Sequence, residues 1–193
     1  MHFSKLSCSL VIFLSLCSLA KADETWTGAS DVRFRGYSTL HDFDGTVNQV
    51  PLKVTVKPGS NGRMVSATSN APVKEMTTAN DKRDVDMWSM FQQAKYRFIK
   101  VEVPPTSEYT LRPGGGKPGS MPVTLTIAGN SSTVNAVVTN VAESATQCSF
   151  DLAFQVSLKA FNLDPPKAAA GLVKVKDGVD VHVHVALKKD GVK

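Results

Sequence analysis

The chain has 193 residues, a formal net charge of +5, 42% hydrophobic and 7% aromatic residues, and three cysteines. Its basic residues are scattered and form no cluster with interleaved aromatic residues, which argues against a nucleic-acid-binding role. The apolar segment from Leu6 to Leu19 has only 14 residues, whereas a spanning helix needs about 20, so we expect no transmembrane segment.

The N-terminus has the features of a cleavable signal peptide. Lys5 precedes the apolar segment, and the small-x-small sequence Ala20-Lys21-Ala22 follows it. We therefore expect residues 1–22 to be a signal peptide, and residues 23–193 to be one exported domain, periplasmic or secreted. Cys148 is the only cysteine outside the signal peptide, so this domain forms no internal disulfide.

Alternating apolar and polar residues dominate the chain from residue 30 onward and predict about nine short β-strands. In the first strand, Val32 and Phe34 lie on one face and Arg33 and Arg35 on the other. The other strands are predicted over residues 40–47, 52–56, 64–73, 96–103, 123–127, 133–141, 148–158 and 179–187.

The segments between these strands contain turn-forming residues, as at Asp44-Gly45, Pro104-Pro105 and Asp177-Gly178. A short helix is predicted over residues 81–94, and one helical turn within residues 162–171. Many short strands joined by polar turns indicate an all-β sandwich or barrel.

Four segments, in order along the chain, resemble the YceI-like family of lipid-binding proteins. In this sequence they read VRF (32–34) with HDFDGTV (41–47), MTTANDKRDVDM (76–87), VTLTIAGNSSTV (123–134), and VSLKAFNL (156–163) with the apolar strand 179–187. Two positions depart from the family pattern: Arg97 stands where proline is usual, and Asn162 where glycine is usual.

The resemblance implies an antiparallel, lipocalin-like β-barrel of about eight strands with one or two short helices. It also implies a lumen that holds a long-chain lipid such as a polyisoprenoid, and export to a bacterial periplasm in many members. An eight-stranded barrel is either filled by its own side chains or just wide enough for one small ligand. A filled structural barrel without a ligand therefore stays open as an alternative.

The inward phase of the strands and one side of the predicted helix supply the candidate ligand-binding residues. We expect Met87, Trp88 and Phe91 to form a gate, with Lys82 and Arg83 beside them to meet an anionic head group. Val137 is among the other valines that the alternation assigns to the lumen. The candidate ligand-binding residues are Phe34, Phe43, Met87, Trp88, Phe91, Phe98, Leu125, Ile127, Phe154 and Val183.

A second hypothesis is a metal-binding or haem-binding stress protein. His182 and His184 are two residues apart in a strand, so they point the same way, and His41 would complete a three-histidine site if the first and last strands are neighbours. No nucleophile elbow is present, and nothing in the sequence links Cys148 to a base. We expect no enzyme and no cofactor, and the sequence leaves a homodimer open.

Overall fold

The structure, a computed structural model, describes residues 23–60, 62–112, 117–168 and 173–191. The predicted signal peptide lies outside these residues. The strands are β1 (Glu24–Ser38), β2 (Phe43–Gly59), β3 (Gly62–Pro72), β4 (Phe98–Ser107), β5 (Gly119–Ile127), β6 (Asn130–Glu143), β7 (Gln147–Ser157), β8 (Lys167–Ala168) and β9 (Val173–Lys189). The helices are η1 (Val73–Glu75), α1 (Asp81–Met90), α2 (Glu108–Leu111) and η2 (Leu158–Phe161).

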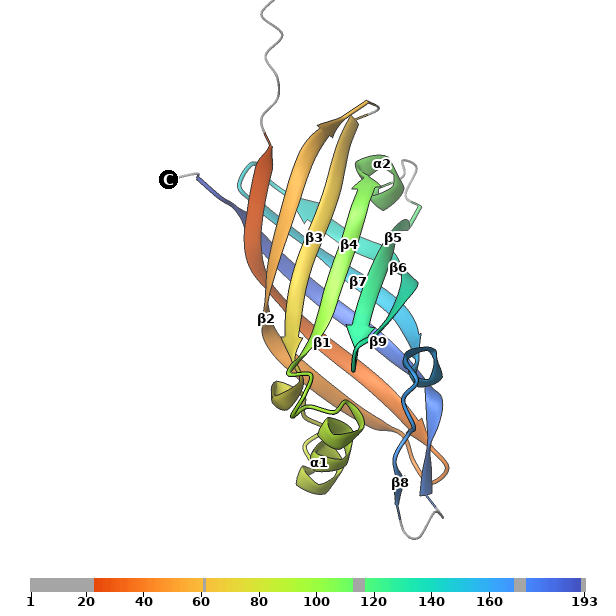
Figure 1. Ribbon diagram of the computed structural model, residues 1–193. Helices are drawn as coiled ribbons and strands as arrows, with labels where there is room; N and C mark the ends of the chain where they lie inside the picture. Colours follow the sequence, from red (N-terminus) through yellow and green to blue (C-terminus); the bar gives the residue numbers. More distant parts are fainter. Residues whose placement is uncertain (1–22, 61, 113–116, 169–172, 192–193) are drawn as a thin grey trace, which may run out of the picture.

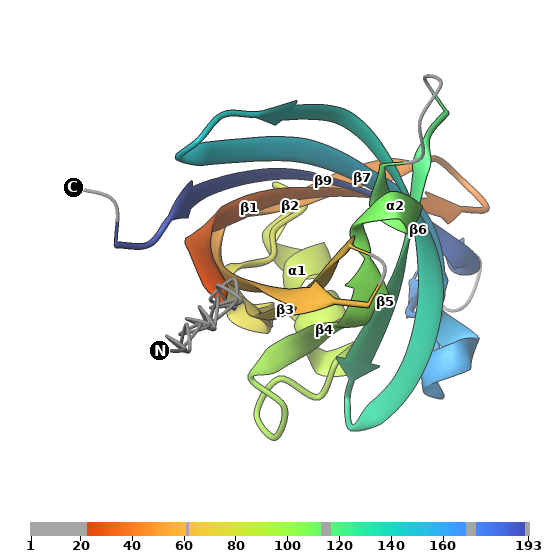
Figure 2. The same cartoon turned by 90° about the horizontal axis from the view of Figure 1, so that it is seen from above.

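Eight of the strands close into an antiparallel barrel, as predicted (Figure 1). Each strand from β1 to β6 pairs with the next, β7 pairs with β9, and β9 pairs back with β1. The short β8 pairs only with β9 and stands outside the ring. Figure 2 looks along the barrel and shows the strands surrounding a central space, with α1 at the far end.

A β-bulge joins two segments that the sequence predicts as separate strands. Val47 pairs with Val32 and Val50 pairs with Ser30, so β2 has one more residue than β1 across this step. Gln49 adopts a positive φ of 55°, and its backbone N–H donates to the Asp31 carboxylate at 2.8 Å. The bulge changes which residues face inward, so both halves of one continuous β2 present valines to the lumen.

The three predicted turns named above all lie inside strands instead. Asp44-Gly45 belongs to β2, where it pairs with Arg35 and Phe34 of β1. Pro104 and Pro105 belong to β4, opposite a register shift between Val65 and Ala67 of β3, and β4 pairs with β5 only over residues 100–102. Proline has no N–H for a ladder hydrogen bond, and these prolines stand where the ladder is interrupted. Asp177-Gly178 likewise lies within β9, beside a second register shift.

The predicted helix over residues 81–94 is confirmed as α1, which is shorter and covers one end of the barrel (Figure 1). The Asn80 side chain caps it by accepting a hydrogen bond from the Arg83 N–H at 3.0 Å. The helix ends at Met90, and Gln92 takes a left-handed φ of 51° that an α-helix cannot continue through.

The helical turn expected within residues 162–171 is not formed over residues 162–168, and residues 169–171 lie outside the described part of the chain. A helical turn, η2, lies just before this segment. Its last carbonyls are followed by Asn162, which has a left-handed φ of 54°. Asparagine tolerates this conformation better than most residues, which explains how it replaces the usual glycine. Among the described residues, no helix combines the length and apolar character needed to cross a bilayer.

Candidate functional site

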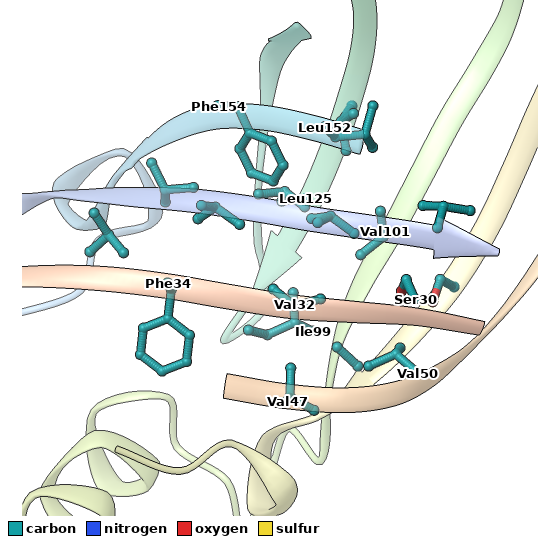
Figure 3. Close-up of a pocket in the computed structure, with 18 of the residues that line it drawn as sticks. Ser30, Val32, Phe34, Val47, Val50, Ile99, Val101, Leu125, Leu152 and Phe154 are labelled. Carbon is teal, nitrogen blue, oxygen red and sulfur yellow. The ribbon is translucent and has the colours of Figure 1, made fainter. Parts of the chain in front are cut away.

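An apolar cavity of about 510 Å³ occupies the barrel lumen. All eight barrel strands and α1 contribute side chains to its wall. Figure 3 draws 18 of the wall residues and labels ten of them, including Val32 and Phe34 of β1 and Leu152 and Phe154 of β7. This volume lies within the range of about 300 to 1,000 Å³ that holds small-molecule ligands in proteins. The lumen is therefore large enough for a ligand of that class.

Several apolar side chains that point into the barrel are only partly buried. In a filled core such residues lose nearly all contact with solvent, because protein interiors are close-packed. Here they retain exposed surface because the lumen in front of them is not filled by other side chains. These residues are Val32, Ile99, Val101, Phe154, Val179, Val181 and Val183.

Two phenylalanine rings pack over glycines at the α1 end of the lumen. Phe34 pairs with Gly45, and Phe43 pairs with Gly36, across the β1–β2 ladder. A Cβ atom on Gly45 would lie 2.2 Å from the Phe34 ring, and one on Gly36 would lie 2.4 Å from the Phe43 ring. The two glycines therefore leave the space that these rings occupy beside the wall.

Helix α1 closes the same end of the barrel with flexible apolar residues. Met87 and Phe91 are buried, and both line the cavity together with Met90. Methionine side chains adapt to irregular shapes because they are unbranched and polarizable. Met87 and Met90 therefore give the α1 end of the lumen a wall whose shape can adapt to a ligand.

Asp84 fixes α1 to the connection that precedes it. This buried carboxylate accepts hydrogen bonds from the Thr77 hydroxyl at 2.7 Å, the Thr78 N–H at 2.7 Å and the Thr78 hydroxyl at 2.5 Å. Burial alone would raise the pKa of Asp84, but these hydrogen bonds, with the nearby Arg83 charge, bring the pKa below its ordinary value. Asp84 is thus a structural anion whose acceptor capacity is used locally.

A network of ion pairs closes the opposite, α2 end. Arg63 donates two hydrogen bonds to Glu108 of α2, at 2.9 and 2.7 Å, and lies 3.6 Å from Glu143 and 3.7 Å from Glu24. Arg112 also pairs with Glu143. The side chains of Arg63 and Glu143 are 29% and 26% exposed, so the network is partly accessible to solvent at this end of the lumen.

The electrostatics of the α2 end follow from these pairs. A hydrogen bond from Lys189 is the main cause of the lowered pKa of Glu24. The hydrogen bonds to Glu108 raise the pKa of Arg63 further above its ordinary value. Cys148 lines the lumen and is partly buried, and burial raises the pKa of its thiol, which agrees with the inert side chain expected from the sequence.

The structure brings eight of the ten candidate ligand-binding residues together around one cavity. Six of them point inward from strands: one each from β1, β2, β7 and β9, and two from β5. Two more come from α1 and its C-terminal cap. These eight are Phe34, Phe43, Met87, Phe91, Leu125, Ile127, Phe154 and Val183.

The other two candidates do not line the cavity. Phe98 is 47% exposed, because Ile99 and Val101 occupy the inward phase of β4 and Phe98 faces outward. Trp88 packs outside the lumen, where its indole N–H donates to the Met76 carbonyl at 3.0 Å and Lys74 covers its ring. Val137, assigned inward by the sequence pattern, is also exposed, since Val138 takes the inward position.

The three histidines do not come together. His182 and His184 lie on the outward phase of β9, whereas His41 is in the connection between β1 and β2, at the rim of the cavity. The His184 ring pairs with Asp151 at 2.7 Å. Within the described residues, no three histidine, cysteine or carboxylate side chains are placed to hold a metal ion. The three-histidine site on which the second hypothesis depends is therefore not formed within the described residues.

The sequence reasoning also missed residues of the wall. Val179 and Val181 extend the row of Val183, and Arg63 shares the inward phase of β3 with Val65 and Ala67. The period-two alternation holds the signal for all of them. Only apolar residues were considered as candidates for the lumen, so the inward-facing Arg63 at the start of β3 was missed.

Solved structures with the same fold share little sequence with this chain. Burkholderia cenocepacia BcnA has a TM-score of 0.62 at 20% identity, with 82% of this chain and 95% of that chain covered. A polyisoprenoid binding domain from Saccharophagus degradans has a TM-score of 0.62 at 16% identity, with 84% and 97% covered. The Campylobacter jejuni YCEI protein has a TM-score of 0.50 at 18% identity, with 71% and 80% covered.

A comparison with curated protein sequences gave no significant match. The family model described as the YceI-like domain matches residues 25–187. This range reaches every strand of the barrel as well as the helix that covers its end. The chain therefore belongs to the YceI-like family.

Proposed function

We propose that this protein is an exported carrier that holds a long-chain lipid, such as a polyisoprenoid, in the barrel lumen. The observation that carries the proposal is the unfilled apolar lumen, in which inward-facing residues such as Val101, Phe154 and Val183 stay partly exposed. A filled structural barrel would bury these side chains. The similarity to a domain described as polyisoprenoid binding supports the same ligand class.

Burial of a hydrocarbon chain is sufficient to drive binding in such a cavity. Each buried methylene or methyl group contributes about 0.8 kcal/mol. A chain of about 20 such groups would gain roughly 16 kcal/mol from burial. This gain exceeds the lower estimates of the translational, rotational and conformational cost of binding. No reacting group is needed for this function, and the apolar wall is suited to solvating a chain of methyl and methylene groups.

Native mass spectrometry of the protein purified from its own organism, followed by organic extraction, tests the carrier function. We expect a mass above that of the polypeptide and an extracted lipid whose fragments are spaced by isoprene units. A polypeptide mass alone, unchanged after incubation with geranylgeraniol and palmitate, would overturn the proposal.

The export part of the proposal rests on the sequence of residues 1–22. The free thiol of Cys148 and the absence of a second cysteine in residues 23–193 place no demand on the redox state of the compartment. N-terminal sequencing of the protein from the exported fraction should give a chain that begins at Asp23. A chain that keeps residues 1–22 and stays with the cytoplasmic fraction would contradict export.

A further inference from the structure

The charged side chains that line the lumen do not balance. They comprise four cations and three carboxylates, so the side chains of the wall carry one more positive than negative charge, with the histidine of the rim counted as neutral. The Asp84 carboxylate next to Arg83 does not line the cavity. The cations are Arg63, Lys82, Arg83 and Arg112, and the carboxylates are Asp86, Glu108 and Glu143. An apolar cavity with an excess positive charge favours a ligand with one negative charge.

The excess lies at the α1 end. At the α2 end, Arg63 and Arg112 are paired with Glu108 and Glu143, so that end is neutral and its charges already have partners. At the α1 end, Lys82 and Arg83 face a single carboxylate of the wall, Asp86. Within the described part of the chain, neither cation forms an ion pair with a carboxylate.

Arg83 is held in place by groups that leave part of its guanidinium free. Its Nε donates to the Thr78 hydroxyl at 2.9 Å, and its Nη2 donates to the Thr78 carbonyl at 3.5 Å. The guanidinium lies 4.8 Å from the centre of the Phe43 ring, which itself lines the cavity. Both carboxylate oxygens of the neighbouring Asp84 accept hydrogen bonds from Thr77 and Thr78. A guanidinium fixed in this way presents its remaining N–H groups to an oxyanion with little loss of conformational entropy.

From this charge distribution we infer that the lumen takes an anionic amphiphile, an isoprenoid or fatty chain with a carboxylate or phosphate head, and holds the head at the α1 rim on Arg83 with Lys82 beside it. This inference rests on the proposed carrier function. The hydrocarbon chain of the ligand points toward the α2 end, where Arg63 and Arg112 are already paired with carboxylates and do not attract a head group. The ligand therefore enters and leaves past α1, whose methionines can rearrange.

Binding of three probes with the same chain tests the inference: geranylgeranyl phosphate, geranylgeranoate and geranylgeraniol. In the wild-type protein at least one anionic probe should bind about tenfold more tightly than the alcohol, because hydrogen bonds to charged groups are stronger than those to neutral ones. The preferred anion identifies the head group as phosphate or carboxylate. The advantage should shrink as salt is added, since the rim is partly open to solvent.

Arg83→Gln and Lys82→Gln should each reduce the affinity for the preferred anion by a larger factor than the affinity for geranylgeraniol. Lys53→Gln, which removes a positive charge from the exposed outer side of β2, is the matched control and should change none of the three affinities. The Lys82 variant guards against misfolding, because Lys82 makes no hydrogen bond that folding depends on.

Equal binding of all three probes to the wild-type protein would overturn the anionic head group and leave the carrier function standing. If Arg83→Gln lowers the affinity for geranylgeraniol as much as the affinity for the anions, Arg83 has a structural role. That result would overturn the inference and leave the carrier function standing. Binding of none of the probes would overturn the carrier function itself, and with it the inference.

Discussion

Replacement of Val183 by phenylalanine separates an open lumen from a filled one. Val183 lies on β9 between Val32 of β1 and Leu152 of β7, and all three line the cavity. Phenylalanine adds about four groups, each of which displaces roughly one methylene of the ligand, so the lost burial is about 3 kcal/mol. We expect the Kd for geranylgeraniol to rise about 200-fold.

The same variant has an opposite signature in a filled barrel. In an open lumen the larger ring occupies empty space, and the free energy of unfolding should stay the same or rise. In a close-packed core it would cost about 1 to 3 kcal/mol through overpacking. Val137→Phe, on the exposed side of β6, is the control and should alter neither quantity. Urea unfolding and calorimetric titration measure both, and a destabilised Val183→Phe variant with unchanged affinity would refute the open lumen.

Three further predictions concern stability and reactivity. Asp84→Ala should lose about 2 to 3 kcal/mol in urea unfolding, because it leaves the buried Thr78 donors unpaired. Since the folded-state pKa of Asp84 lies below its unfolded value, the wild-type protein should lose this stabilisation as the pH falls below about 4, and the variant should lack that dependence. Gly45→Ala should cost about 1 to 3 kcal/mol by displacing the Phe34 ring, and a thermal midpoint equal to the wild type would contradict this. Cys148 should react slowly with maleimide at neutral pH and more slowly with geranylgeraniol bound, whereas rapid labelling would show that its thiol is freely accessible.

The period-two alternation was sufficient to predict an all-β sandwich or barrel, because the strands of both have one apolar and one polar face. The resemblance to the YceI-like family was needed to predict the barrel. The alternation was insufficient at bulges, where one extra residue reverses the phase. The sequence gives no sign that Gln49 is such a residue, so β2 was predicted as two strands. Pro104 and Pro105 were predicted as a turn because two consecutive prolines rarely fit a strand. They fit β4 because its ladder is interrupted there, and that interruption depends on pairing with strands that are distant in sequence.

The candidate site was predictable in composition but not in volume. Phe34, Leu125 and Val183 face inward in either a filled or an open barrel, and the sequence pattern is the same for both. The difference depends on how strand register and closure set the width of the lumen. Phe98 was misassigned because an aromatic residue at the first position of a strand carries no information about which phase the strand adopts.

Methyl NMR of the valine residues during titration with geranylgeraniol tests the central claim that the lumen is the binding site. We predict that the methyl signals of Val32, Val101 and Val183, which line the cavity, shift and show contacts to the ligand. The signals of Val85 and Val137, which are 57% and 45% exposed on the outside, should stay in place. Shifts confined to these outer valines, or no shifts at saturating ligand, would contradict a lumen that holds a lipid.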